Sequence, residues 1–201
     1  MKQVRIFSWV AVFVAALFVG YKYFNAADEQ ASGPGGPFTL TAHTGEKMSD
    51  TDFRGKYMLV YFGYSYCPDV CRVELHKLTT GLKLLEEEGY DISPIQPLFI
   101  SVDPERDTVA ELADYMLDYH ENLIALTDTL EEIADVAREY RVYYKKRVQD
   151  GIEGYLMDHQ SYIFVMERDG RYSRLLTSRD TPQDIADVFK PVLKKLEKTG
   201  R

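Results

Sequence analysis

Residues 57–75, YMLVYFGYSYCPDVCRVEL, decide the fold. Tyr57–Phe62 is a continuous apolar run, which is typical of a central strand buried on both faces. Apolar residues then recur at roughly helical spacing over Val70–Glu88, and Gly89 is a suitable residue to end that helix. Cys67 and Cys71 lie where the strand passes into the helix. Ligands gather at the carboxyl ends of strands in open α/β sheets, so this junction is the expected functional site.

Strand and helix patterns alternate on both sides of this stretch. Further strands are predicted at Phe38–Ala42, Ile95–Val102, Leu123–Leu126, Ser161–Met166 and Arg171–Thr177. Helices are predicted from Thr108 to about Tyr119, after Thr129, and from Thr181-Pro182 onward, since each start carries a capping signal or a first-turn proline. This order predicts the α/β class, as a thioredoxin-like sandwich around a mixed sheet with an added N-terminal β-hairpin.

The first residues are typical of one transmembrane helix. Ile6–Phe24 is apolar apart from Ser8, Lys22 and tyrosine hydroxyls. At about 1.5 Å per residue it spans roughly 28 Å, close to the thickness of the hydrocarbon core. Lys2 and Arg5 precede it, so we expect a cytoplasmic N-terminus. A cleaved signal peptide is the alternative, although the residues that follow form a poor cleavage site.

These patterns divide the chain into a membrane anchor at 1–24, a flexible linker at 25–37 (NAADEQASGPGGP) and a globular domain at 38–201. No transit-peptide pattern precedes the apolar segment, so the expected location is a bacterial inner membrane, single-pass, with the domain in the periplasm. Lys and Arg total 24 against 32 Asp and Glu, a formal charge of −8. That balance excludes a nucleic-acid partner, which would need a basic surface.

Residues 67–71, CPDVC, contain both cysteines of the chain. Two thiolates four residues apart at a helix start can reach one metal ion, and the helix N-terminus lowers the pKa of thiols. The alternative is a structural disulfide, but closing so short a loop would contribute only about 2 kcal/mol. The spacing therefore favours a metal or redox role.

A metal held here needs a third ligand, and the four histidines of the chain are the candidates. His76 points to another side of the predicted helix, His120 lies near a helix C-terminus where the dipole alone favours histidine, and His43 lies in a turn. His159 lies in a predicted loop beside Asp158, which is a candidate to orient the imidazole. A purely structural histidine remains the alternative at that position.

The donor set limits the choice of metal. Thiolates select Cu(I), and two thiolates with one imidazole suit a soft ion of low coordination number, whereas zinc would require a fourth donor. Met157 is a weaker candidate for an extra soft ligand, because it equally suits the wall of the site.

Phe62–Cys71, FGYSYCPDVC, resembles the metal loop of the Sco (SenC) family, the copper metallochaperones of cytochrome c oxidase assembly. Val102–Thr108, Tyr140–Lys145, Asp158-His159 and Asp169-Gly170 resemble the other signatures of that family in their order and spacing, and the similarity runs from about Gly35 to Leu193. The resemblance implies a thioredoxin-like fold, one transmembrane helix, and copper, as Cu(I) and also as Cu(II), bound by Cys67, Cys71 and His159.

The same resemblance implies a metallochaperone rather than an enzyme. It would deliver copper to, or prepare, the binuclear copper centre of cytochrome c oxidase subunit two or a related copper-receiving protein. Other copper chaperones or thioredoxin-like reductants are implied as further partners. Arg72 departs from the many family members with proline after the second cysteine, and a cation there favours disulfide chemistry. Asp103 and Arg106 fall in a second signature, where a turn at Pro104 also explains them.

The alternative function is a membrane-tethered thiol–disulfide oxidoreductase that uses Cys67 and Cys71 as a redox-active pair. Thioredoxins have two residues between their cysteines and a cis-proline facing them. This chain has three, and its Asp158-His159 loop has no proline. Peroxidase activity and a purely structural assembly role are weaker alternatives that rest on analogy.

Overall fold

The computed structural model describes residues 33–148, 151 and 154–199. The chain from Pro34 onward forms a compact unit with its own hydrophobic core, as expected of a domain that folds alone. The predicted membrane segment Ile6–Phe24 lies outside the described residues, and none of the described helices is long and apolar enough to cross a bilayer. The division into anchor, linker and domain therefore stays a prediction.

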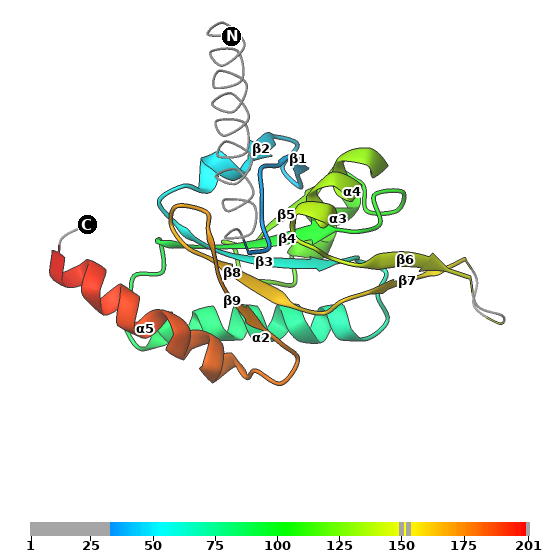
Figure 1. The fold of residues 1–201 in the computed structure, drawn as a ribbon. Coiled ribbons are helices and arrows are strands. Elements are labelled where there is room, and N and C mark those ends of the chain that lie inside the picture. Colours follow the sequence, from blue (N-terminus) through cyan, green and yellow to red (C-terminus); the bar gives the residue numbers. More distant parts are fainter. Residues whose placement is uncertain (1–32, 149–150, 152–153, 200–201) are drawn as a thin grey trace, which may run out of the picture. The chain divides into compact units, whose positions relative to one another are not determined.

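Seven strands of the described chain form one mixed sheet in the order β2-β1-β5-β4-β3-β8-β9 (Figure 1). Their bounds are β1 Thr39–Ala42, β2 Lys47–Ser49, β3 Tyr57–Gly63, β4 Ile95–Ser101, β5 Ile124–Thr127, β8 Ile163–Met166 and β9 Tyr172–Leu176. Strands β3, β4 and β5 are parallel, and β1 and β8 pair antiparallel to the edges of that group. The predicted opening hairpin, β1–β2, and terminal hairpin, β8–β9, are both present.

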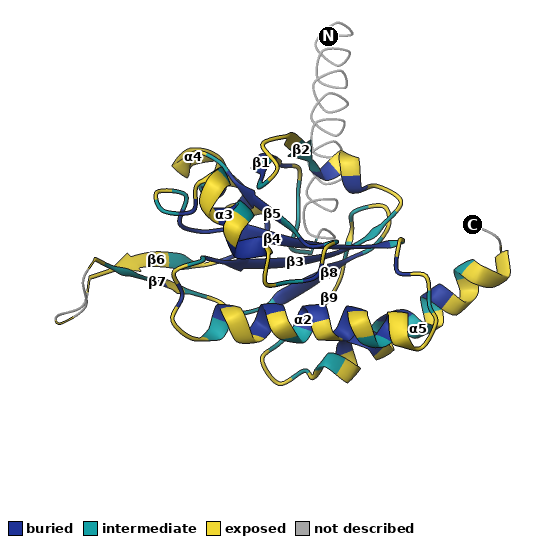
Figure 2. Ribbon diagram, turned by 180° about the vertical axis from the view of Figure 1, so that it is seen from behind, coloured by how far each residue is buried: buried dark blue, intermediate teal, exposed yellow. Residues whose placement is uncertain are grey.

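Helices cover both faces of this sheet. Helices α2 (Val70–Glu87) and α5 (Pro182–Thr199) lie on one face, and α3 (Val109–Met116) and α4 (Leu130–Glu139) lie on the other, with the buried residues of each turned toward the strands (Figure 2). A short 3-10 helix, η1 (Asp50–Phe53), follows β2. The arrangement confirms the predicted thioredoxin-like sandwich with its N-terminal hairpin.

The central strands are buried on both faces, as their composition predicts. All seven residues of β4 are buried, and so are all residues of β3 after Tyr57. The start signals of two helices also form: the side chain of Thr108 accepts from the Glu111 N–H, and Thr129 and Glu132 make a complete capping box. The junction between β3 and α2 thus follows directly from a strand that is buried from Met58 to Gly63.

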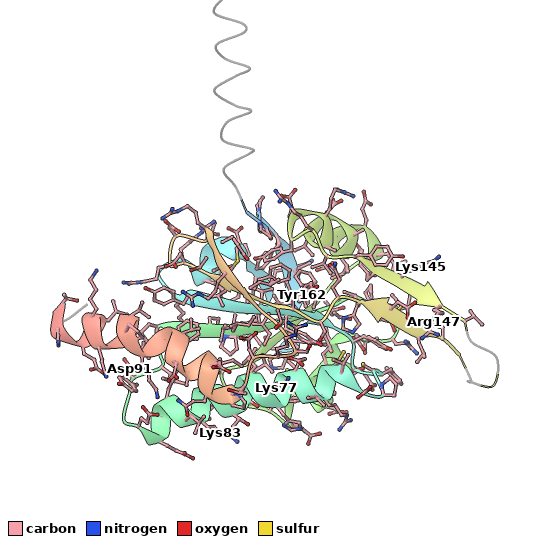
Figure 3. The ribbon with its side chains drawn as sticks, turned by 60° about the horizontal axis from the view of Figure 1, so that its bottom comes forward. Lys77, Lys83, Asp91, Lys145, Arg147 and Tyr162 are labelled. Carbon is pink, nitrogen blue, oxygen red and sulfur yellow. The ribbon has the colours of Figure 1, made fainter. Side chains whose placement is uncertain are left out.

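A separate two-stranded sheet, β6 (Tyr144–Arg147) with β7 (Leu156–His159), extends from the body of the domain. Its register pairs Tyr144 with His159. The prediction that His159 lies in a loop is therefore wrong, because Leu156–His159 pairs as a strand with Tyr144–Arg147. Lys145 and Arg147 lie on the arm of this hairpin (Figure 3).

Candidate metal centre

Three side chains that sequence analysis singled out come together at one edge of the main sheet. Cys67 lies in the loop after β3, Cys71 lies in the first turn of α2, and His159 ends β7. One potential ligand atom from each lies within 4.8 Å of the others, and both cysteines are free. Among the described residues this is the one such cluster of histidine, cysteine and carboxylate side chains. The spread of the three atoms is compatible with a single ion bound at about 2.0–2.3 Å from each after a small adjustment.

The contacts of the His159 ring determine which of its nitrogens can bind a metal. Nδ1 lies 3.0 Å from the carbonyl oxygen of Gln160, which can only accept, so Nδ1 carries the proton. In the neutral ring Nε2 then has a free electron pair, and it lies 3.2 Å from Sγ of Cys71. A backbone carbonyl thus orients the imidazole as outer partners of metal ligands do.

The pKa values of the two thiols are shifted in opposite directions. A hydrogen bond from Cys71, with further help from backbone N–H groups at the start of α2, holds the pKa of Cys67 well below its usual range. The hydrogen bond that the Cys71 thiol donates to Cys67, together with burial, raises the pKa of Cys71. At neutral pH the metal-free pair is therefore one thiolate and one thiol, so the site has a soft anionic donor before any metal arrives.

Two tyrosines enclose the imidazole. The rings of Tyr61 and Tyr64 both meet the His159 ring edge-on, with centroids 6.3 Å and 5.8 Å away. Burial raises the pKa of Tyr64 to about 12, so its hydroxyl stays protonated. The Tyr61 hydroxyl lies 3.1 Å from Oγ of Ser161, just beyond the hairpin. These side chains were not predicted as part of the site, although both belong to the aromatic stretch that precedes Cys67.

A buried carboxylate secures the loop that carries Cys67. Asp107 is fully buried and accepts from the backbone N–H of Ser65 at 3.1 Å, from Oγ of Ser65 at 2.5 Å, and from Oγ of Ser101 at 2.5 Å. Burial raises the pKa of this carboxyl. The loop is also close-packed at its start, where a methyl group added to Gly63 would lie 3.0 Å from Sγ of Cys71.

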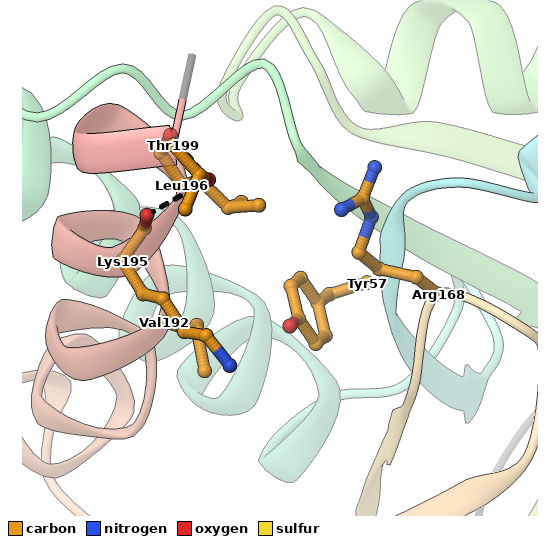
Figure 4. Close-up of a pocket in the computed structure, with 6 residues that line it drawn as sticks. All are labelled: Tyr57, Arg168, Val192, Lys195, Leu196 and Thr199. Carbon is orange, nitrogen blue, oxygen red and sulfur yellow. Dashed lines mark hydrogen bonds between the residues drawn. The ribbon is translucent and has the colours of Figure 1, made fainter. Parts of the chain in front are cut away.

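The more accessible ligands of the site are His159, which is half-buried, and Cys67. Cys71 is fully buried, whereas Cys67 keeps 7% of its surface exposed. Cys67 forms part of a hollow of about 490 Å³ whose lining also includes Ser65, Tyr66, Pro68, Arg72, Glu111, Asp114, Tyr115 and Asp118. A second hollow of about 550 Å³ lies between the start of β3 and the end of α5 (Figure 4). It is lined by Tyr57, Arg168, Val192, Lys195, Leu196 and Thr199, which offer no thiolate or imidazole.

The other three histidines have structural contacts. His43 accepts from the backbone N–H of Ala125. His76 is exposed on α2 with its ring 5.2 Å from that of Tyr119. His120 is buried, with Nε2 3.1 Å from a carboxylate oxygen of Glu86. None of the three belongs to the cluster of Cys67, Cys71 and His159, and His76 in particular was predicted to point away from the cysteines.

Two expectations about the neighbours of His159 have different outcomes. Asp158 was expected to orient the imidazole, and this is wrong: its carboxylate pairs with Arg147 at 2.9 Å on the other face of the strand, because adjacent residues of a strand point in opposite directions. Met157 is buried, and its backbone partly offsets the rise that burial causes in the pKa of Tyr64. It belongs to the wall of the site.

The sequence of this chain is similar to those of known proteins. The family model described as SCO1/SenC matches residues 26–194. The chain is 42% identical over 158 residues to the mitochondrial protein SCO2 homolog of Bos taurus, a match that covers 79% of this chain and 59% of that protein. The chain spans about half the length of the curated relatives it matches.

Solved structures give the same result for the fold. Bradyrhizobium japonicum ScoI with copper bound superposes with a TM-score of 0.72 at 38% identity, covering 79% of this chain and 99% of that one. Arabidopsis thaliana ScoI with copper bound gives a TM-score of 0.73 at 35% identity, covering 83% and 99%.

Proposed function

This chain belongs to the SCO1/SenC family, and from that premise we propose that it is a copper metallochaperone that holds copper through Cys67, Cys71 and His159. The observation that carries the proposal is the convergence of three soft or borderline donors from two segments 88 residues apart. Two structural relatives were solved with copper bound. Two thiolates and an imidazole suit Cu(I), and Cu(II) is proposed as a second bound state.

Each of the three proposed ligands has its own role in binding and releasing copper. Cys67 supplies a preformed thiolate, and Cys71 gives up its proton as copper binds. His159 contributes Nε2 from a ring already held by the Gln160 carbonyl. With three donors the ion keeps an open coordination position. A thiolate of a receiving protein can then bind from the side on which His159 and Cys67 are the more accessible donors, before the donors of this chain leave.

The receiving site is proposed to be the binuclear copper centre of cytochrome c oxidase subunit two or of a related copper-receiving protein. The supply of copper is assigned to other copper chaperones, and thioredoxin-like reductants would keep the cysteines reduced. We place the domain on the periplasmic side of a bacterial inner membrane, held by a single-pass helix at Ile6–Phe24. That placement rests on the apolar pattern of this segment and on the cations before it.

Thiol–disulfide exchange is a second candidate, because the lowered pKa of Cys67 gives a nucleophilic thiolate beside a second thiol. The imidazole discriminates between the two functions. Copper binding uses His159 as a ligand, whereas dithiol exchange has no need of it.

The test measures the affinity of the reduced full chain for Cu(I), in detergent and without oxygen, by competition with a chromogenic chelator. We expect one tightly bound copper per chain. His159→Ala should weaken binding by more than about tenfold, since even outer-shell changes at metal sites cost 10–100-fold. His76→Ala is the matched control, because His76 is exposed and contacts Tyr119 instead. Equal affinities for the two variants would return His159 to a structural role and make thiol–disulfide exchange the leading function.

A further inference from the structure

Arg106 lies between the two segments that supply the metal ligands. It follows β4 in the turn that starts at Asp103, and its side chain is 23% exposed. One segment is the loop after β3, which carries Cys67. The other is the β6–β7 hairpin, which ends at His159. Among the described residues Arg106 contacts Tyr64, Tyr66, Tyr155 and Asp103 and none of the three ligand side chains, so it is not itself a ligand of the proposed site.

The guanidinium of Arg106 contacts the cysteine loop through two aromatic rings. Its central carbon lies 4.9 Å from the ring centroid of Tyr66 and 5.6 Å from that of Tyr64. Tyr66 is the residue immediately before Cys67, and Tyr64 packs edge-on against the His159 ring. Cations at these distances are attracted by the ring faces, and the planar guanidinium also stacks on them.

The same guanidinium contacts the hairpin more closely. Its central carbon lies 3.8 Å from the ring centroid of Tyr155, and its Nη1 donates to the Tyr155 carbonyl oxygen at 3.0 Å. Asp103 fixes both partners, because its carboxylate accepts from Nε of Arg106 at 2.5 Å and from the Tyr155 hydroxyl at 2.8 Å. Asp103 is almost fully buried, which makes this a rigid anchor.

The hairpin depends on such an anchor for its position. Strands β6 and β7 pair only with each other in the part of the chain that the structure describes, and an isolated two-stranded hairpin is marginally stable in water. Tyr155 is the residue immediately before β7, and His159 is its last residue. A shift of the start of β7 relative to the cysteine loop is therefore transmitted along this four-residue strand to the imidazole.

We propose that Arg106 is a positioning residue, which clamps the start of β7, at the turn end of the His159 hairpin, to the Cys67 loop and thereby sets the three-donor geometry. This inference rests on the proposed copper function, because it concerns the same site. It assigns a role to the Asp103–Arg106 signature, for which the turn at Pro104 gave no more than a structural explanation.

The experiment uses the reduced full chain in detergent with Cu(I) as the probe. Arg106→Gln removes the positive charge and shortens the side chain only moderately. Arg106→Lys keeps the positive charge but loses the planar guanidinium group that stacks on the tyrosine rings. Arg138→Gln is the control, since Arg138 lies on α4 and pairs with its neighbour Asp135. We expect both Arg106 variants to bind Cu(I) about tenfold or more weakly, the range for residues that orient metal ligands. The control should match the unsubstituted protein.

A double-mutant cycle separates positioning from a general structural effect. If Arg106 acts through His159, its replacement should cause little further loss of affinity in a His159→Ala background. X-ray absorption of the copper-loaded Arg106→Gln variant should show fewer nitrogen scatterers. Unchanged affinity, or an equal loss with and without His159, would overturn the inference.

A copper-free readout distinguishes failure of this inference from failure of the proposed function. Hydrogen exchange at the amides of residues 156–159 should accelerate in the Arg106 variants, while the amides of β3 and β4 keep their protection. If the unsubstituted chain binds no copper, the proposed function fails, yet this exchange result still tests the clamp. Unaltered exchange in the hairpin would reject the clamp whatever the copper affinity.

Discussion

Replacing Asp107 by alanine should destabilise the domain, whereas replacing it by asparagine should be tolerated. Asp107 is 0% exposed and accepts three hydrogen bonds from Ser65 and Ser101. Oγ of Ser101 itself accepts from the Asp103 N–H, so its own proton must go to Asp107. Asparagine can satisfy the same set: its oxygen can accept from the Ser65 N–H and the Ser101 hydroxyl, and its amide can donate to Oγ of Ser65.

The magnitudes follow from the groups left without partners. In Asp107→Ala the buried Ser101 hydroxyl and the Ser65 N–H lose their acceptor, and each such loss costs about 1–3 kcal/mol. The expected decrease in the free energy of unfolding is about 3 kcal/mol, which lowers Tm by roughly 6–12 °C for a domain of this size. Asp107→Asn should stay within about 1 kcal/mol, since an amide avoids the burial of a charge.

The pH dependence gives a second check on this site. Burial raises the pKa of Asp107 above its ordinary 3.8, so the folded domain binds this proton more tightly than the unfolded chain does. The unsubstituted domain therefore gains stability relative to Asp107→Asn as the pH falls through the raised pKa toward 3.8.

The assay is thermal and urea unfolding of residues 34–201, followed by circular dichroism, with Asp135→Ala as the control. Asp135 pairs with Arg138 on the surface, and such exposed pairs contribute about 0–1 kcal/mol. If Asp107→Asn were as damaging as Asp107→Ala, the negative charge and not the pattern of accepted hydrogen bonds would hold the cysteine loop, and the reasoning given above would be refuted.

Three further predictions concern the site and its surroundings. Gly63→Ala should lower the free energy of unfolding by about 1–3 kcal/mol and should also weaken Cu(I) binding, because the new methyl group would lie 3.0 Å from Sγ of Cys71. Urea unfolding measures the first effect, and chelator competition measures the second. Metal-free protein should show the 240 nm absorbance of one thiolate at neutral pH, and Cys67→Ser should remove this absorbance. Binding of Cu(I) to the unsubstituted protein should release about one proton, which comes from Cys71. Release of two protons would contradict the lowered pKa of Cys67. His120→Ala should cost about 1–3 kcal/mol, because the Asn122 N–H loses its acceptor and the buried ring leaves an unfilled space, yet Cu(I) affinity should be unchanged. A weakened affinity would show that this buried histidine influences the site.

The sequence was informative where local pattern and burial agree. Tyr57–Phe62 and Ile95–Val102 are apolar because the strands they form are covered by helices on both faces, so composition alone predicts their place. The helix starts at Thr108 and Thr129 were likewise predictable, since capping depends on residues three apart in the chain. The junction that holds both cysteines follows from these local signals.

The hairpin was not predictable in the same way. Its first strand, residues 144–147 (YKKR), buries no residue fully and is stabilised by pairing with a segment 12 residues further on. Its register places His159 opposite Tyr144, and no local pattern encodes that register. From the residues alone His159 stayed one of four candidates, because its approach to Cys71 depends on contacts 88 residues apart.

The difference between local signals and long-range contacts also explains why the CPDVC loop alone does not make the site. Cys67 and Cys71 are placed by the fold of the central strand and its helix, so any chain with this junction would bring two thiols together. The imidazole comes from a hairpin that lies outside the main sheet, and the contacts of Arg106, Tyr155 and Asp103 hold the start of its second strand. Two thiols alone support disulfide exchange, and the third donor is what makes the site suited to a soft metal ion. The balance between copper binding and redox chemistry in this chain is therefore set less by the cysteines than by how firmly the hairpin is held against them.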